Sequence, residues 1–227
     1  MTIFIDVDNT LLDFDACANK SIELACAKFG VPYTTRLVDV FHPVNLDLWH
    51  RLERKEITKE QLFQVRFNKV FEVLGIDCDG HAFEDAFHKN LFETAIKIDG
   101  AEQLLKYLHS KFKVYVASNA TLAQQQNRLK NADLLKYVDG IFVSEEIGYP
   151  KPQKAFFDAC FASLPDANPS DTLMIGDSVS ADINGAREYG MKTLWYNHRH
   201  ESTDGVECDF VADDLYQIVD LIENLDI

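Results

Sequence analysis

The chain alternates short apolar runs with helical patterns, and this alternation constrains its fold more than any other feature. The runs are rich in β-branched residues, as strands buried on both faces are. They are 2–7, 113–118, 140–144, 172–176, 192–196 and the weaker 209–212. Helical stripes between them comprise Ala101, Leu104, Leu105 and Leu108, and then Phe156, Cys160 and Leu164. Such alternation predicts an α/β fold, a doubly wound parallel sheet with functional groups at the carboxyl ends of its strands.

One long interval after the first strand breaks this alternation because it contains no convincing strand. Its apolar residues have helical spacing, with one face formed by Ala18, Ile22, Ala25 and Phe29 and another by Phe63, Phe67, Val70, Phe71 and Leu74. Thr58 followed by Gln61 is typical of a capping box. We therefore expect an α/β core of 1–15 and 94–227, with an inserted α-helical domain of 16–93. Its position in the chain predicts a lid over the strand ends.

The composition indicates a globular protein with an acidic surface. Apolar residues make up 47% and charged residues 26% of the chain, and the formal net charge is −15. Such a surface repels polyanions, and no basic stripe offsets it, so a nucleic-acid polymer is not expected as a partner. A small anionic substrate stays compatible with the sequence, because a bound divalent cation can reverse the local field.

The cysteines and the absence of targeting signals exclude several classes of protein. The five cysteines are scattered without a Cys-x-x-Cys pair, which argues against a disulfide framework and a zinc site. No apolar run is long enough to span a bilayer, and the N-terminus lacks the features of a signal peptide. We expect a cytoplasmic protein with no membrane partner, either a monomer or a homodimer.

The first predicted strand runs into a crowd of carboxylates in the stretch IDVDNTLLDFD. Asp6 and Asp8 are separated by one residue and project from the same side of an extended segment. Their repulsion must be offset elsewhere in the fold. A calcium loop is excluded because the glycine and glutamate that it requires are missing. A helix cap can explain Asp13 or Asp15, but not Asp6 at the end of an apolar strand.

Two other segments after strands carry groups that suit an anion. Ser118 and Asn119 follow the second strand and can donate hydrogen bonds, although Ser-Asn is also common in turns. Lys151 lies between two prolines that restrict its backbone, which suits a fixed cation. A lone lysine is, however, usually a solvated surface residue. Neither segment identifies a site by itself.

The segment after the fourth strand carries two more carboxylates, Asp177 and Asp182, where the chain enters a helix. A simple helix cap would account for Asp177 and leave Asp182 without a role. The order along the chain is thus Asp-x-Asp-x-Thr, Ser, Lys and Gly-Asp-x-x-x-x-Asp. This set resembles the haloacid dehalogenase-like hydrolase superfamily over essentially the whole chain. The helical insertion resembles the group that carries an α-helical cap at the first insertion point.

This resemblance implies a two-step phosphoryl transfer. Asp6 would be the nucleophile that forms an aspartyl-phosphate intermediate. Asp8 would protonate the leaving oxygen and then act as the base that activates water. Mg²⁺ would be held by a carboxylate oxygen of Asp6, the backbone carbonyl of Asp8 and Asp177.

The resemblance also implies roles around these groups. Ser118, Asn119 and Lys151 would hold the phosphoryl oxygens, by side chains and neighbouring amides, and stabilise charge in the transition state. Asp182 would orient the metal ligands from a second layer, and Thr10 would organise the loop. The asparagine at position 9 replaces a glycine that is frequent in the superfamily.

The second aspartate of the first motif separates two branches of the superfamily. The dehalogenase branch lacks an acidic residue at the position of Asp8, since a halide leaves without a proton, whereas an alkoxide needs one. The chain therefore resembles a phosphatase or phosphotransferase.

The substrate is suggested by further resemblance to bacterial pyrimidine 5′-nucleotidases, which dephosphorylate nucleoside monophosphates. The similar stretches are 45–49, 66–67, 74–77 and 118–120. A nucleobase needs a planar apolar slot with polar groups at its edge, so Asn45, Trp49 and Arg66 are candidate contacts. Each also suits a structural role within the helical domain.

Two other functions stay open. A sugar-phosphate or phosphoglycolate phosphatase, or a phosphoglucomutase, would use the same motifs. A silent relative that acts as a binding or regulatory protein is disfavoured, because Asp6, Asp8, Lys151 and Asp177 are all present.

Overall fold

The computed structural model describes residues 1–224, which divide into two compact units. One unit combines Met1–Asp13 with the chain from Ile96 onward, and the other is Phe14–Ala95. The insertion expected at 16–93 lies within the second unit. Among the described residues, no helix has both the length and the apolar character needed to cross a membrane.

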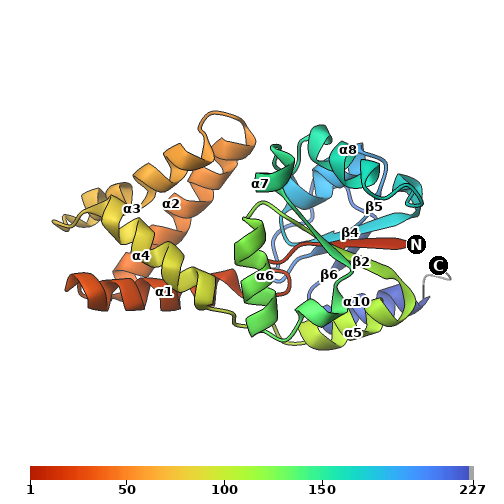
Figure 1. Ribbon diagram of the computed structural model, residues 1–227, viewed down its shortest axis with the longest axis horizontal. Coiled ribbons are helices and arrows are strands. Elements are labelled where there is room, and N and C mark those ends of the chain that lie inside the picture. The colour runs from red at the N-terminus through yellow and green to blue at the C-terminus, as the bar shows by residue number, and fades with distance from the viewer. Residues whose placement is uncertain (225–227) are drawn as a thin grey trace. The chain divides into compact units, whose positions relative to one another are not determined.

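The described residues of the first unit form a six-stranded parallel sheet with helices on both faces, which confirms the predicted α/β fold (Figure 1). The strand order is β3-β2-β1-β4-β5-β6. The strands are β1 (Thr2–Ile5), β2 (Lys113–Ser118), β3 (Gly140–Val143), β4 (Thr172–Gly176), β5 (Lys192–Tyr196) and β6 (Phe210–Ala212). Every predicted run contains a strand, and β1 ends before its predicted limit, so Asp6 lies just beyond it.

Helices cover the two sides of this sheet (Figure 1). On one side α8 (Lys154–Ala162) packs Phe156 and Cys160 against Phe4 of β1 and Met174 of β4. On the other side α5 (Ala101–Lys111) contacts α10 (Leu215–Asn224). The remaining elements are α6 (Leu122–Asn131), α7 (Ser144–Ile147), α9 (Gly185–Glu188), the 3₁₀ turns η1 (Leu135–Tyr137) and η2 (Pro169–Asp171), and the π-helical segment η3 (Val179–Asn184).

The strand order places β1 between β2 and β4, which brings distant parts of the chain together. Ile5 is in register with Val116 of β2 and with Ile175 of β4. The backbone N–H of Asp6 then donates to the carbonyl of Ile175 at 2.9 Å. The three strands therefore end at the same edge of the sheet. Open α/β sheets bind their ligands at such an edge, where successive connections diverge to opposite sides.

Residues Phe14–Ala95 form four helices with a core of their own (Figure 1). The helices are α1 (Phe14–Phe29), α2 (Thr35–Glu53), α3 (Lys59–Leu74) and α4 (Gly80–Glu93). The core is rich in phenylalanine and includes Phe41, Phe67, Phe71, Phe83 and Phe87. The predicted capping box is confirmed at the start of α3, where Thr58 and Gln61 exchange two hydrogen bonds between side chain and backbone.

A buried ion pair lies inside this phenylalanine core. The side chains of Arg66 and Glu84 are each 2% exposed, and they share two hydrogen bonds. Arg66 also donates to Asn45 Oδ1 at 2.7 Å, and its guanidinium carbon lies 4.8 Å from the ring centre of Phe87. Burial acts to raise the pKa of Glu84, but Arg66 and His88 outweigh burial and lower it. The pair therefore holds α3 to α4 from within.

We expect Glu84→Gln to lower the free energy of unfolding by about 3–5 kcal/mol, because the charge of Arg66 would stay buried without its counter-ion. The double variant Glu84→Leu with Arg66→Met should lie much closer to the wild type, since it removes both charges together. Urea unfolding followed by circular dichroism measures these differences. In the exposed pair of Lys20 and Glu23, the control Glu23→Gln should cost no more than about 1 kcal/mol. A Glu84→Gln protein as stable as the wild type would contradict this reading.

Candidate active site

A buried lysine lies among the residues at the carboxyl ends of β1, β2 and β4. The side chain of Lys151 is 2% exposed, and its ammonium donates to Asp6 Oδ1 at 2.8 Å, to Asp182 Oδ1 at 2.6 Å and to the carbonyl of Ala117 at 2.5 Å. An ammonium has three N–H donors, so these three contacts use all of them. Burial opposes the charge of Lys151, but Asp182 and Asp6 outweigh burial and raise its pKa.

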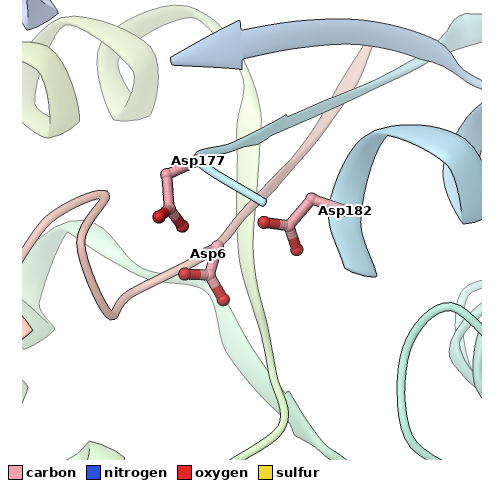
Figure 2. Close-up of side chains that lie close together, drawn as sticks. All are labelled: Asp6, Asp177 and Asp182. Atoms are coloured by element: carbon pink, nitrogen blue, oxygen red, sulfur yellow. The ribbon is translucent and has the colours of Figure 1, made fainter. Parts of the chain in front are cut away.

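Three carboxylates surround a common space (Figure 2), and two of them accept hydrogen bonds from this lysine. They belong to Asp6 after β1, Asp177 after β4 and Asp182 in η3, and one oxygen from each lies within 4.8 Å of the others. Burial raises the pKa of Asp6 to about 7, even though Lys151 acts to lower it. Burial also raises the pKa values of Asp177 and Asp182. These groups are therefore close enough to repel one another and suited to a shared cation.

The local structure after β4 orients the carboxylates of Asp177 and Asp182. The Trp195 indole N–H donates to the carbonyl of Asp177 at 2.9 Å, which fixes the chain as it leaves the strand. The π-helical segment η3 then brings Asp182 back, and the backbone N–H of Ser178 donates to its Oδ2 at 3.1 Å. Gly176 permits this close approach, because a Cβ at that position would collide with the carboxylate of Asp182.

The three carboxylates suit a divalent cation, but they differ in how many of their oxygens are already hydrogen-bonded to the protein. Both oxygens of Asp182 already accept hydrogen bonds, one from Lys151 and one from Ser178. Asp6 binds Lys151 through Oδ1 alone, and the carboxylate of Asp177 points toward the same space (Figure 2). Buried carboxylate oxygens are the ligands that Mg²⁺ prefers. Asp6 and Asp177 could therefore contact the ion, with Asp182 behind them.

The second aspartate of the first motif is held by helix α6. The carboxylate of Asp8 is 26% exposed and accepts from Arg128 Nη1 at 2.5 Å and from Gln125 Nε2 at 2.8 Å. The neighbouring Asn9 has a φ of +61°, a left-handed conformation that asparagine tolerates better than most residues. This explains why a glycine or an asparagine suits the position. The bonds to Gln125 and Arg128 hold the side chain of Asp8 against α6.

The predicted phosphate-binding residues lie at the end of β2. Ser118 Oγ accepts from the backbone N–H of Ala120 at 3.2 Å and from Gln125 Nε2 at 2.9 Å. The side-chain amide of Asn119 donates to the carbonyl of Lys151 at 3.0 Å and accepts from its backbone N–H at 2.8 Å. The Asn119 side chain thus positions the backbone of Lys151.

Thr10 belongs to the loop after β1, and the three expected substrate contacts belong to the helical unit. Thr10 is fully buried, and its hydroxyl has no hydrogen-bond partner among residues 1–224. Arg66 and Asn45 bond each other within the helical unit and are both buried, so their side chains support its core, and their contact with substrate stays a prediction. The guanidinium is buried against Glu84 and phenylalanine rings. Trp49 is half-buried on α2, and its contact with substrate stays a prediction.

Comparison with known proteins agrees with this geometry. A family model described as haloacid dehalogenase-like hydrolase matches residues 1–190. The chain belongs to this family. The match includes all four motif segments, so the resemblance inferred from them is confirmed.

Relatives of this haloacid dehalogenase-like (HAD-like) hydrolase include a protein named as a HAD-hydrolase and two named as pyrimidine 5′-nucleotidases. YfnB of Bacillus subtilis is 33% identical over 86% of this chain and 83% of its own length. The pyrimidine 5′-nucleotidase PynA of Streptococcus pneumoniae is 33% identical over 87% and 84% of the two chains. The pyrimidine 5′-nucleotidase YjjG of Escherichia coli is 29% identical over 97% and 96%. A crystal structure of YfnB bound to magnesium is 30% identical, with a TM-score of 0.92 over 100% of this chain and 98% of that one.

Sequence reasoning missed three residues of this HAD-like site. Gln125 and Arg128 bond Asp8, and Trp195 holds the backbone of Asp177. A glutamine and an arginine three positions apart on one helix share a face, which was the available signal. That spacing is equally typical of a solvated helix surface. Only the packing of α6 distinguishes the two.

We expect Gly176→Ala to destabilise the protein by about 1–3 kcal/mol, because the new methyl group would displace the carboxylate of Asp182 from Lys151 and Ser178. Thermal and urea unfolding measure the loss. The same substitution in an Asp182→Ala background is the matched control and should cost much less, since the colliding group is gone. Equal losses in the two backgrounds would show that the cost of Gly176→Ala has another cause.

Proposed function

We propose that this HAD-like hydrolase is a magnesium-dependent phosphatase that works through an aspartyl-phosphate intermediate, and that it acts on nucleoside 5′-monophosphates. The observation that carries the proposal is the buried carboxylate of Asp6, held by Lys151 beside two further aspartates. A carboxylate fixed in this way is an oriented nucleophile. Asp8, two positions further on, supplies the acid that an ester oxygen needs in order to leave.

The proposed cation is Mg²⁺, bound by a carboxylate oxygen of Asp6, by Asp177 and by the backbone carbonyl of Asp8. When bound, the ion would neutralise charge on the phosphate dianion and on the carboxylate that attacks it. Support comes from the three close carboxylates of this chain and from the magnesium-bound structure of YfnB. Asp182 would keep the site in shape through its bonds to Lys151 and Ser178.

In the first step, an oxygen of Asp6 forms a bond to phosphorus while the bond from phosphorus to the ester oxygen breaks. The proton on Asp8 passes to the departing oxygen, so the product leaves as an alcohol. In the second step, water attacks the phosphorus, Asp8 takes its proton, and the bond to Asp6 breaks. Inorganic phosphate is released and both aspartates return to their starting states.

The groups around the nucleophile would stabilise the transferring phosphoryl group. The hydroxyl of Ser118 and the backbone amide of Asn119 are the proposed donors to its oxygens, since the N–H of Ala120 already donates to Ser118 Oγ. Lys151 has all three N–H donors engaged with the protein, so we assign it an electrostatic role. Its charge would offset that of Asp6 and of the incoming phosphate without a direct contact.

Support for a nucleoside monophosphate comes from PynA and YjjG, two relatives named pyrimidine 5′-nucleotidases. We propose that the helical unit acts as the cap that selects the substrate, and that Trp49 of α2 contributes an apolar surface for the base. Sugar phosphates and phosphoglycolate stay the alternative class, because the motifs of the α/β unit act on the phosphate and carry no information about the rest of the ester.

The purified protein should hydrolyse 4-nitrophenyl phosphate when Mg²⁺ is present and lose this activity in EDTA. Asp6→Asn should abolish turnover, because an amide cannot form the acyl phosphate, while the fold and thermal stability persist. Release of 4-nitrophenolate and of inorganic phosphate provides the measurement. Asp13→Asn is the control from the same stretch of sequence and should retain activity. An active Asp6→Asn protein would overturn the assigned mechanism.

A panel of phosphate esters tests the substrate class. We expect kcat/KM for dUMP and TMP to exceed that for glucose 1-phosphate, glycerol phosphate and phosphoglycolate. Trp49→Ala should raise KM for the nucleotides and leave kcat/KM for 4-nitrophenyl phosphate nearly unchanged. Leu46→Ala, an exposed position on the same helix, is the matched control. If sugar phosphates rank above dUMP and TMP, the nucleotidase assignment is wrong and the phosphatase mechanism still stands.

A further inference from the structure

Helix α6 holds both oxygens of the Asp8 carboxylate through two buried side chains. Arg128 Nη1 lies 2.5 Å from Oδ1, and Gln125 Nε2 lies 2.8 Å from Oδ2. Both α6 side chains are fully buried, whereas Asp8 retains some exposure. Two polar groups of this size are costly to bury unless they are bonded. The family motifs assign no task to either of them.

We propose that Gln125 and Arg128 are positioning residues that orient the carboxylate of Asp8 for proton transfer. This inference rests on the proposed phosphatase function. Asp8 lies in a loop beyond the end of β1, and a short side chain there would otherwise exchange between rotamers. A donor on each oxygen selects one orientation. Each oxygen keeps a second lone pair that can carry the catalytic proton.

Gln125 also connects Asp8 to the proposed phosphate-binding serine. Its amide nitrogen has two N–H groups, one for Asp8 Oδ2 at 2.8 Å and one for Ser118 Oγ at 2.9 Å. Ser118 Oγ accepts a second bond from the backbone N–H of Ala120. With both lone pairs used, the hydroxyl proton of Ser118 is left to donate, which suits an anionic phosphoryl oxygen. One amide thus sets the direction of both groups.

The test compares two leaving groups, since only one of them needs the proton from Asp8. The parameter kcat/KM reports events up to release of the first product. For the best alkyl phosphate of the ester panel, Gln125→Leu and Arg128→Lys should lower kcat/KM about 10- to 100-fold, a part of the usual contribution of an acid–base group. For 4-nitrophenyl phosphate, kcat/KM of Arg128→Lys should change less than about threefold, because 4-nitrophenolate leaves without a proton. Gln125→Leu should lose more with this ester than Arg128→Lys does, because it also releases Ser118.

A second measurement examines the hydrolysis step. If Asp8 is misaligned as a base, the aspartyl-phosphate breaks down more slowly. Rapid mixing of either variant with 4-nitrophenyl phosphate should then show a burst of 4-nitrophenolate close to one equivalent of enzyme, followed by a lowered steady rate. The exposed α6 residues Gln126 and Lys130 provide the matched controls Gln126→Leu and Lys130→Met, which should behave as the wild type.

A double-mutant cycle separates positioning from structural support. In an Asp8→Asn background, Arg128→Lys should lower kcat/KM for the alkyl ester by less than about twofold further, since it acts through Asp8. Gln125→Leu should keep only the part of its loss that passes through Ser118. Equal losses of Arg128→Lys for both leaving groups, or full losses of either variant in the Asp8→Asn background, would overturn the inference. A wild-type protein that hydrolyses no ester would instead reject the proposed function itself, so the two failures are distinguishable.

Discussion

The buried ammonium of Lys151 is the interaction on which the α/β unit depends. Two nearly buried carboxylates, those of Asp6 and Asp182, would repel each other and lose hydration without compensation. Lys151 bonds both of them and the carbonyl of Ala117, and Asn119 fixes its backbone in turn. This cation therefore joins segments that are far apart in sequence. It also orders the proposed nucleophile before any ligand binds, which is the preorganisation that electrostatic catalysis requires.

The sheet topology makes this convergence possible. Because β1 lies between β2 and β4, the residues after all three strands emerge at one edge. A nucleophile, a phosphate-binding segment and a metal-binding segment can therefore come from separate parts of the chain. Helix α6 adds a further element by holding Asp8 through Gln125 and Arg128. The proposed acid and nucleophile, separated by one residue, thus have different supports, which suits their different tasks.

The helical unit uses a buried charge for another purpose. Arg66 and Glu84 pair inside a phenylalanine core, with Asn45 and His88 completing the hydrogen bonds. The pKa of Glu84 is lowered, because Arg66 and His88 compensate its charge. This is what a structural ion pair requires. At Asp6 the pKa is raised instead, because burial and neighbouring carboxylates outweigh the lysine. The two sites show that burial of a charge does not by itself indicate function.

The sequence by itself determined the order of strands and helices and the chemistry at the strand ends. A strand buried on both faces requires an uninterrupted apolar run, and parallel strands end at one edge, so a meeting of Asp6, Lys151 and Asp177 could be expected. Tertiary structure alone decided which charges touch. Arg66 and Arg128 both lie on helices with no local mark of burial, yet one enters a hydrophobic core and the other holds Asp8. Their roles differ because helix packing, which depends on residues far away in sequence, selects each side chain's surroundings.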